Sequence, residues 1–228
     1  MTVAAEPLAR ADLAGATRQV LKIGHGIKPD VLLVELEGRA AEPGSPASVV
    51  VKDYAPRGPW VTRWLGPWLA AREQRIHRAL GPLSAVPNWL GAIDELAFAI
   101  EFRPGDPLSR GLRAQRSAEQ IEAFLERLDA SVAAMHEHGV VHLDLRHRDN
   151  VLMDAVGDPV LIVFGAAMHF RCSSFWYRWY RPTVLVYDRR ALAKWRERLH
   201  PGAPPSRRTL WRRLRSRLRR RRTPPARG

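Results

Sequence analysis

Two acceptor side chains, Asp144 and Asn150, stand six residues apart in the segment HLDLRHRDNVL. A carboxylate beside a nucleophile can take up its proton, and an amide oxygen can bind a cation. Far upstream, Lys52 lies within the apolar run VVVKDY, where a lysine is unusual unless it serves a polar site. Phosphoryl transfer from ATP requires this kind of set, because its catalysis is mostly positioning and charge neutralisation.

Further parts of such a site occur in a workable order along the chain. Gly24 and Gly26 flank His25 in a turn whose backbone can cover phosphates, and Glu73 on the next helix can pair with Lys52. Taken singly, the GHG turn also fits a plain turn, Lys52 an edge-strand lysine, and Glu73 a solvated charge. The joint pattern is more specific, because HLDLRHRDNVL is followed at a suitable distance by PVLIVFG.

The order of these motifs resembles the protein-kinase-like superfamily over residues 18 to 170. The resemblance implies ATP as cofactor, Asp144 as the catalytic carboxylate and Asn150 as a metal ligand. It also implies a hinge in IEFRPGDPL that holds adenine through main-chain groups. The positions to which it gives a nucleotide-binding role are Gly24, Gly26, Lys52, Glu73, Glu101 and Phe102.

Within that superfamily, the loop DLRHRDNVL is similar to that of small bacterial lipopolysaccharide-core (Kdo) kinases and RIO-like kinases. It is one step longer than the usual kinase loop. The chain also leaves no room for the helical subdomain that eukaryotic-type protein kinases place after this region. The resemblance therefore implies a minimal kinase whose phosphate acceptor is a protein or sugar hydroxyl.

Val163 stands where this family carries an aspartate that binds Mg²⁺. Valine offers no oxygen ligand, and loss of metal neutralisation costs roughly a thousandfold in rate. One interpretation is a pseudokinase that still binds ATP; the other is slow transfer with Mg²⁺ held by Asn150 and the phosphates alone. We expect impaired catalysis, with weak or absent Mg²⁺ binding.

The elements that position these residues indicate an α+β fold. Strand patterns occur in a hairpin over 18–38 and in the runs SVVVKDYA, NWLGAID and LAFAIEF, with a tryptophan-rich loop and then a helix ending near Gly81. Ser117 and Gln120 form a capping box before a helix that Gly139 ends. Short strands NVLMDA and PVLIVF follow, and a last helix is expected over 187–199.

From this pattern we expect a two-lobed kinase-like fold with a five-stranded antiparallel N-lobe and a short, mainly helical C-lobe. The expected units are an N-terminal extension over 1–17, the N-lobe over 18–103, the C-lobe over 104–200 and a proline linker with a basic tail over 201–228.

The basic tail accounts for most of the net charge of +14, because residues 207–227 contain eleven arginines and no acid. Leu210, Trp211, Leu214 and Leu218 share one face if this segment is helical. Such a helix can lie on an anionic membrane, where a lipid-linked substrate would be found. The alternatives are a disordered tail or unspecific nucleic-acid binding. A non-enzymatic module that binds membrane or nucleic acid is therefore the alternative function.

The single cysteine, Cys172, excludes an intramolecular disulfide and indicates a reducing compartment. The N-terminus shows no secretory signal, and no apolar run is long enough to span a membrane. We expect a cytoplasmic protein that lies on the inner face of the membrane if its tail binds lipid.

Overall fold

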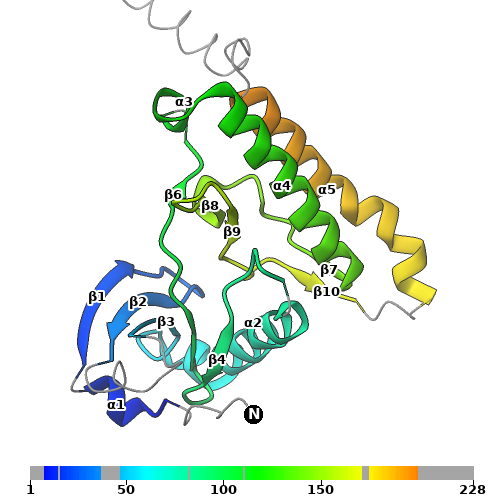
Figure 1. The fold of residues 1–228 in the computed structure, drawn as a ribbon. Coiled ribbons are helices and arrows are strands. Elements are labelled where there is room, and N and C mark those ends of the chain that lie inside the picture. Colours follow the sequence, from blue (N-terminus) through cyan, green and yellow to red (C-terminus); the bar gives the residue numbers. More distant parts are fainter. Residues whose placement is uncertain are drawn as a thin grey trace, which may run out of the picture.

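The computed structural model describes residues 8–14, 16–36, 47–81, 83–109, 111–170 and 175–199. It has an α+β fold, with an antiparallel sheet at one end and two long helices at the other (Figure 1). Cys172 and the basic tail, with its predicted amphipathic helix, lie outside the described residues. Within the described part, none of the helices is long and apolar enough to cross a membrane.

Five strands form the antiparallel sheet, as the sequence predicts, in the order β1–β2–β3–β5–β4. Their bounds are β1 (Thr17–Lys22), β2 (Asp30–Glu35), β3 (Ser48–Asp53), β4 (Trp89–Ala92) and β5 (Ala97–Glu101). In the central strand β3, Lys52 pairs with Val31 of β2 on one side and with Phe98 of β5 on the other. Lys52 is therefore not an edge-strand lysine.

The other elements lie around and after this sheet. The helical elements are α1 (Arg10–Ala14), η2 (Val61–Leu65), α2 (Gly66–Leu80), α3 (Leu112–Gln115), α4 (Ala118–Glu137), η3 (Arg148–Asn150) and α5 (Phe175–Leu199). The short strands are β6 (Asp106–Pro107), β7 (Val140–Val141), β8 (Val151–Met153), β9 (Pro159–Leu161) and β10 (Met168–His169). They form a three-stranded sheet in the order β6–β8–β9 and the pair β7–β10.

The alternation of β3 decides where Lys52 points, because successive side chains of a strand face opposite sides of the sheet. Val51 belongs to a buried cluster that includes Leu13 of α1. Val50 belongs to a different cluster that includes Ala70 of α2. Lys52 is two residues after Val50, so its side chain lies on the same face of the sheet and faces α2.

The tryptophan-rich stretch before α2 is helical, so the prediction of a loop there was wrong. Residues 61–65 form the π-helical segment η2, which runs directly into α2. Pro67 lies in the first turn of α2. The predicted end of this helix is correct, since α2 finishes at Leu80.

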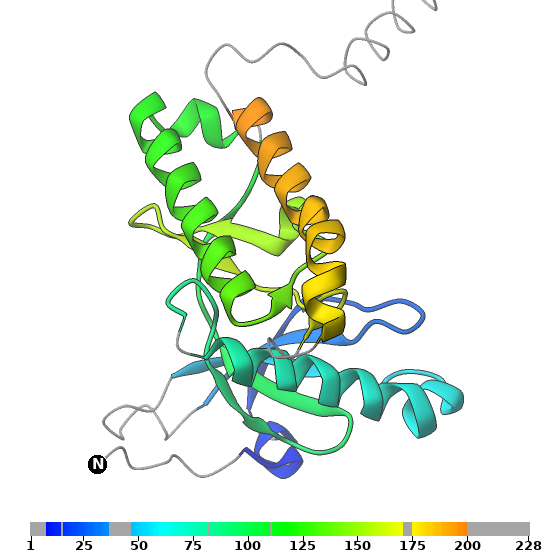
Figure 2. The same cartoon turned by 90° about the vertical axis from the view of Figure 1, so that its right-hand side faces the viewer.

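The second half of the fold is built on α4 and α5, which run side by side (Figures 1 and 2). The predicted capping box is present at the start of α4, where Ser117 and Gln120 satisfy each other's backbone amides. Gly139 follows the helix with a φ of 75°, a conformation that suits glycine. The last helix was predicted too short: α5 begins at Phe175 and continues through Pro182.

One hydrophobic cluster joins the two halves. Ile76 and Leu80 of α2 pack in the same buried cluster as Leu128 of α4, Phe164 and Trp195 of α5. The helix α2 therefore contacts both the sheet and the helical half, and Figure 2 shows it lying between them. This position allows residues of α2 to hold segments of both halves in fixed geometry.

Candidate functional site

A buried ion pair joins the centre of the sheet to α2. The Nζ of Lys52 lies 2.5 Å from Oε1 of Glu73, as predicted, and both side chains are almost wholly shielded from solvent. Burial alone acts to raise the pKa of Glu73, but the Lys52 ammonium and the hydrogen bonds to the carboxylate outweigh it and lower this pKa. Glu73 is therefore a carboxylate, held opposite a cation from which water is excluded.

The same pair holds the segment on either side of Val163. Lys52 Nζ donates to the carbonyl oxygen of Ile162 at 3.1 Å, and Glu73 Oε1 accepts the amide of Phe164 at 3.2 Å. Arg72, next to Glu73 on α2, donates to the carbonyl of Gly165 at 2.9 Å. The backbone around Val163 is thus fixed from α2 and β3 together.

Asp144 and Asn150 form a second polar group in the helical half. The Nδ2 of Asn150 donates to Oδ2 and to the carbonyl oxygen of Asp144, each at 2.8 Å. The carbonyl of Asn150 accepts the amide of Ile162 at 3.2 Å. Because Ile162 also binds Lys52, the structure brings Lys52, Glu73, Asp144 and Asn150 into one hydrogen-bonded network around residues 162–164.

The segment that carries Asp144 is anchored by Asp188 of α5, whose side chain is completely buried. Its carboxylate accepts the amide of His142 at 2.8 Å and the amide of Leu143 at 2.9 Å. The same carboxylate lies 3.0 Å from Nε2 of His136. Leu143 has a φ of 65°, a left-handed conformation that costs roughly 1–2 kcal/mol for a non-glycine residue, and the bonds to Asp188 offset this cost.

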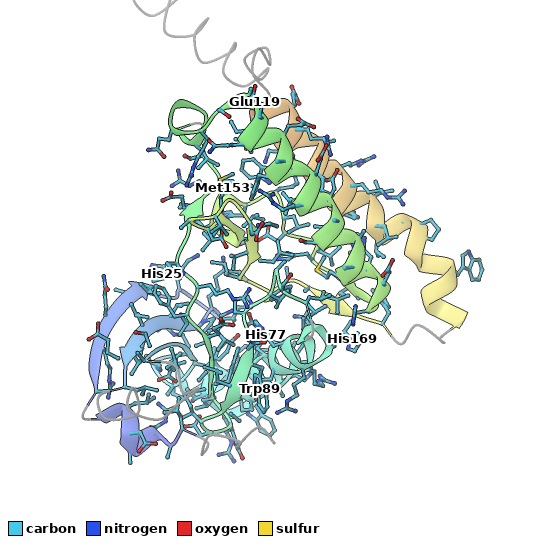
Figure 3. All side chains as sticks on the ribbon, viewed as in Figure 1. His25, His77, Trp89, Glu119, Met153 and His169 are labelled. Atoms are coloured by element: carbon cyan, nitrogen blue, oxygen red, sulfur yellow. The ribbon has the colours of Figure 1, made fainter. Side chains whose placement is uncertain are left out.

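Three rings pack between the two halves. Phe164 contacts His77 of α2, with ring centroids 5.1 Å apart, and His142, at 5.0 Å. Figure 3 shows His77 at this boundary. His142, in the segment HLDL, therefore packs against the residue that follows Val163.

Burial keeps both of these histidines neutral. Burial and the nearby Lys52 ammonium lower the pKa of His77 to about 4, and burial also lowers the pKa of His142. His142 Nδ1 accepts the amide of Asp144 at 3.4 Å, so its proton is on Nε2. Among the described residues, neither ring has a hydrogen-bond partner for Nε2. The two imidazoles therefore act as packing groups rather than as bases.

The glycine turn between β1 and β2 is fixed within the sheet half. The amide of Gly24 donates to Asp30 Oδ1 at 2.7 Å, and Arg57 binds both the Gly24 carbonyl and Asp30. A Cβ on Gly24 would lie 2.2 Å from the carbonyl oxygen of Lys28, so only glycine fits. Gly26 has a φ of 63°. Within the described part of the chain, neither glycine hydrogen bonds to the network around Val163.

The predicted adenine-binding segment follows β5. The carboxylate of Glu101 accepts the amide of Asn88 at 3.0 Å and pairs with Arg103 at 3.1 Å, so this side chain has a structural role. Phe102 is half-buried and packs on the α2 side of the sheet. The segment 102–105 belongs to no helix or strand, and the amide of Arg103 makes no backbone hydrogen bond to the described residues. The backbone N–H of Arg103 is therefore a candidate hydrogen-bond donor.

Val163 is half-buried at the centre of this network and supplies no donor or acceptor from its side chain. Asp154 and Asp158, in the turn between β8 and β9, are bound to the turn backbone and to Arg127. The described residues contain no group of three or more His, Cys, Asp or Glu side chains arranged to hold a metal. The side chain at position 163 therefore supplies no oxygen ligand for a magnesium ion.

Three polar residues of this region escaped prediction. Asp188 and Arg72 bind backbone atoms far away in the sequence, and no local pattern distinguishes them from other helix charges. Asp149 is a second carboxylate in the loop of Asp144, and the motif HRDN did display it. Its side chain pairs with His147 at 3.5 Å and with Arg148 at 3.3 Å. It therefore belongs to the outer edge of the loop.

A scan against models of protein families finds no match to this chain, and a search of curated proteins finds none either.

Proposed function

We propose that this chain is an ATP-binding protein with a two-lobed, protein-kinase-like fold and an impaired phosphotransferase site. One observation carries the proposal. The Lys52–Glu73 pair and the Asp144–Asn150 pair bind the same short segment, residues 162–164, although they come from distant parts of the chain. Residues placed at random in an α+β fold have no reason to converge in this way.

Each group retains bonding capacity that suits its proposed role. A lysine ammonium has three donors, and Lys52 uses two of them on Glu73 and Ile162, which leaves one for a phosphate oxygen. Asp144 accepts from Asn150 through Oδ2, so its other oxygen can accept a proton from a hydroxyl nucleophile. The backbone of residues 102–105 would hold the adenine.

The same geometry supports weak catalysis. A metal that bridges ATP phosphates needs oxygen ligands, and Val163 has none at the centre of the network. No step of the proposed chemistry therefore depends on a protein-bound metal. What remains is positioning by Lys52, which is shielded from water, and proton uptake by Asp144, which is half-buried. Slow transfer to a protein or sugar hydroxyl, or nucleotide binding alone, is the expected outcome.

ATP binding tests the proposal. Lys52→Met combined with Glu73→Leu removes both charges together, so no unpaired ion is left in the interior. We expect the full chain to bind ATP with little gain from added Mg²⁺, and the double variant to bind about tenfold more weakly, a change of about 1.4 kcal/mol. Isothermal titration calorimetry measures both.

Lys22→Met is the matched control, because Lys22 is an exposed lysine at the end of β1. It should leave ATP affinity unchanged. Absence of ATP binding by the unmodified chain would overturn the proposal and favour a non-enzymatic interaction module.

A further inference from the structure

Three tryptophans project into solvent from η2, its N-cap and the first turn of α2. Trp60, Trp64 and Trp68 are 66%, 67% and 54% exposed. They follow one another at intervals of four residues, and side chains at that spacing are neighbours on a helix surface. Single exposed apolar residues are common, but a contiguous row of large aromatic rings marks an interaction surface.

The surroundings of this row are cationic. The guanidinium of Arg63 lies 5.6 Å from the Trp64 ring centre, and that of Arg72 lies 5.6 Å from the Trp68 ring centre. From residue 54 to residue 72 the sequence contains three arginines and no acid. The two acids that flank this stretch, Asp53 and Glu73, are both buried. Arg57 is paired with Asp30, so Arg63 and Arg72 are the cations that lie beside the exposed rings of this row.

The turn between β1 and β2 extends this surface. Arg57, just before η2, binds the Gly24 carbonyl and Asp30, so it ties the turn to the start of the helical segment. Ile23 and Ile27 of the turn are exposed. Figure 2 shows the turn and η2 projecting on the same side of the molecule. We refer to Ile23, Ile27, Trp60, Trp64 and Trp68 together as the tryptophan surface.

We propose that the tryptophan surface docks onto an anionic lipid bilayer. Tryptophan prefers the interface between headgroups and acyl chains, where its amphipathic ring meets both environments. Arginines near the surface are attracted to anionic headgroups. A row of rings along a helix can meet a flat bilayer together, with the apolar side of the helix at the level of the headgroups. The proposal uses residues of the described fold, so it is independent of ATP binding and of the tail.

Vesicle binding by the full chain tests this inference. The variant Trp60→Ala, Trp64→Ala, Trp68→Ala keeps the basic tail, and alanine keeps the helix. We expect its partition into vesicles of phosphatidylcholine and phosphatidylglycerol to fall about tenfold or more, because membrane binding scales with the apolar area inserted. We also expect brominated phosphatidylcholine in those vesicles to quench the tryptophan fluorescence of the unmodified chain but much less that of the variant.

Trp179→Ala is the matched control, because Trp179 of α5 is also a tryptophan and is 68% exposed. It should retain the partition of the unmodified chain. Equal partition by the triple variant would overturn the proposal, as would an equal loss in the control. A tryptophan-dependent affinity for single-stranded RNA without affinity for vesicles would also overturn it and assign the surface to nucleic acid.

Discussion

The two sides of the candidate site are held in place by different physical means. On the sheet side, a lysine and a glutamate neutralise each other in the interior and bind the backbone on either side of Val163. On the helical side, a single buried carboxylate, Asp188, accepts two backbone amides and so fixes the loop that carries Asp144. The first device depends on two matched charges, and the second on one carboxylate that is satisfied by backbone amides and by His136.

The comparison shows which groups hold the backbone of the site in place. Both devices place ionised groups in the interior, which is costly unless the bonds are complete. Their presence around Val163 means that the scaffold of the site is maintained even though its central side chain is apolar. The backbone around Val163 is held from both sides, and each side can be weakened by itself.

The largest effect is expected on the helical side. Asp188→Ala leaves the amides of His142 and Leu143 buried without partners, at about 1–3 kcal/mol each, and removes the support for the left-handed Leu143. We expect the free energy of unfolding to fall by about 5 kcal/mol in urea denaturation. Asp188→Asn keeps one carbonyl oxygen and should lose less. A loss below about 1 kcal/mol in the alanine variant would show that Asp188 does not anchor the loop.

On the sheet side, the loss of stability should depend on whether Lys52 or Glu73 is left without its partner. Lys52→Met leaves Glu73 as an unpaired buried carboxylate, and breaking such a pair costs about 3–5 kcal/mol. Adding Glu73→Leu removes that charge, so the double variant should recover most of the loss. Thermal and urea unfolding of the unmodified chain, Lys52→Met, Glu73→Leu and the double variant form a double-mutant cycle. Strictly additive losses would contradict a coupled pair.

Acid should weaken the contact between the two halves through His77. Its pKa is lowered from 6.5 to about 4 in the folded protein, so between these values the unfolded chain binds a proton that the folded chain does not. Stability from this group is complete above pH 6.5 and declines as the pH falls toward 4. At pH 5 the decline amounts to about 2 kcal/mol.

His77→Leu should remove this part of the pH dependence, since leucine does not titrate. Unfolding free energies measured at pH 7 and pH 5 give the slope for each protein. His25→Leu, in the exposed turn between β1 and β2, is the control and should keep the slope of the unmodified chain. Identical slopes for all three proteins would mean that His77 is not buried in the neutral form.

The residues that hold the site in place could be predicted from the sequence better on the sheet side than on the helical side. Lys52 is visible because it interrupts a valine run, and Glu73 because it lies on the helix that follows. Asp188 binds amides 46 and 45 residues away, and a side chain that serves distant backbone leaves no periodic trace. The prolines and glycines around Trp60 and Trp64 indicated a loop, whereas packing continues the helix through a π-helical turn. Local sequence patterns thus predicted most helices and strands. The residues that anchor distant backbone, such as Asp188, could be found only from the structure.

The central claim is that the scaffold of a phosphotransferase site is intact and only its metal ligand is missing. Val163→Asp tests it most directly, because the half-buried position can accept a carboxylate at the centre of the network. We expect this variant to raise Mg²⁺-dependent ATP turnover by about a thousandfold, and Asp144→Asn in the same background to remove the gain. Fast Mg²⁺-dependent turnover by the unmodified chain, insensitive to Asp144→Asn, would contradict the account.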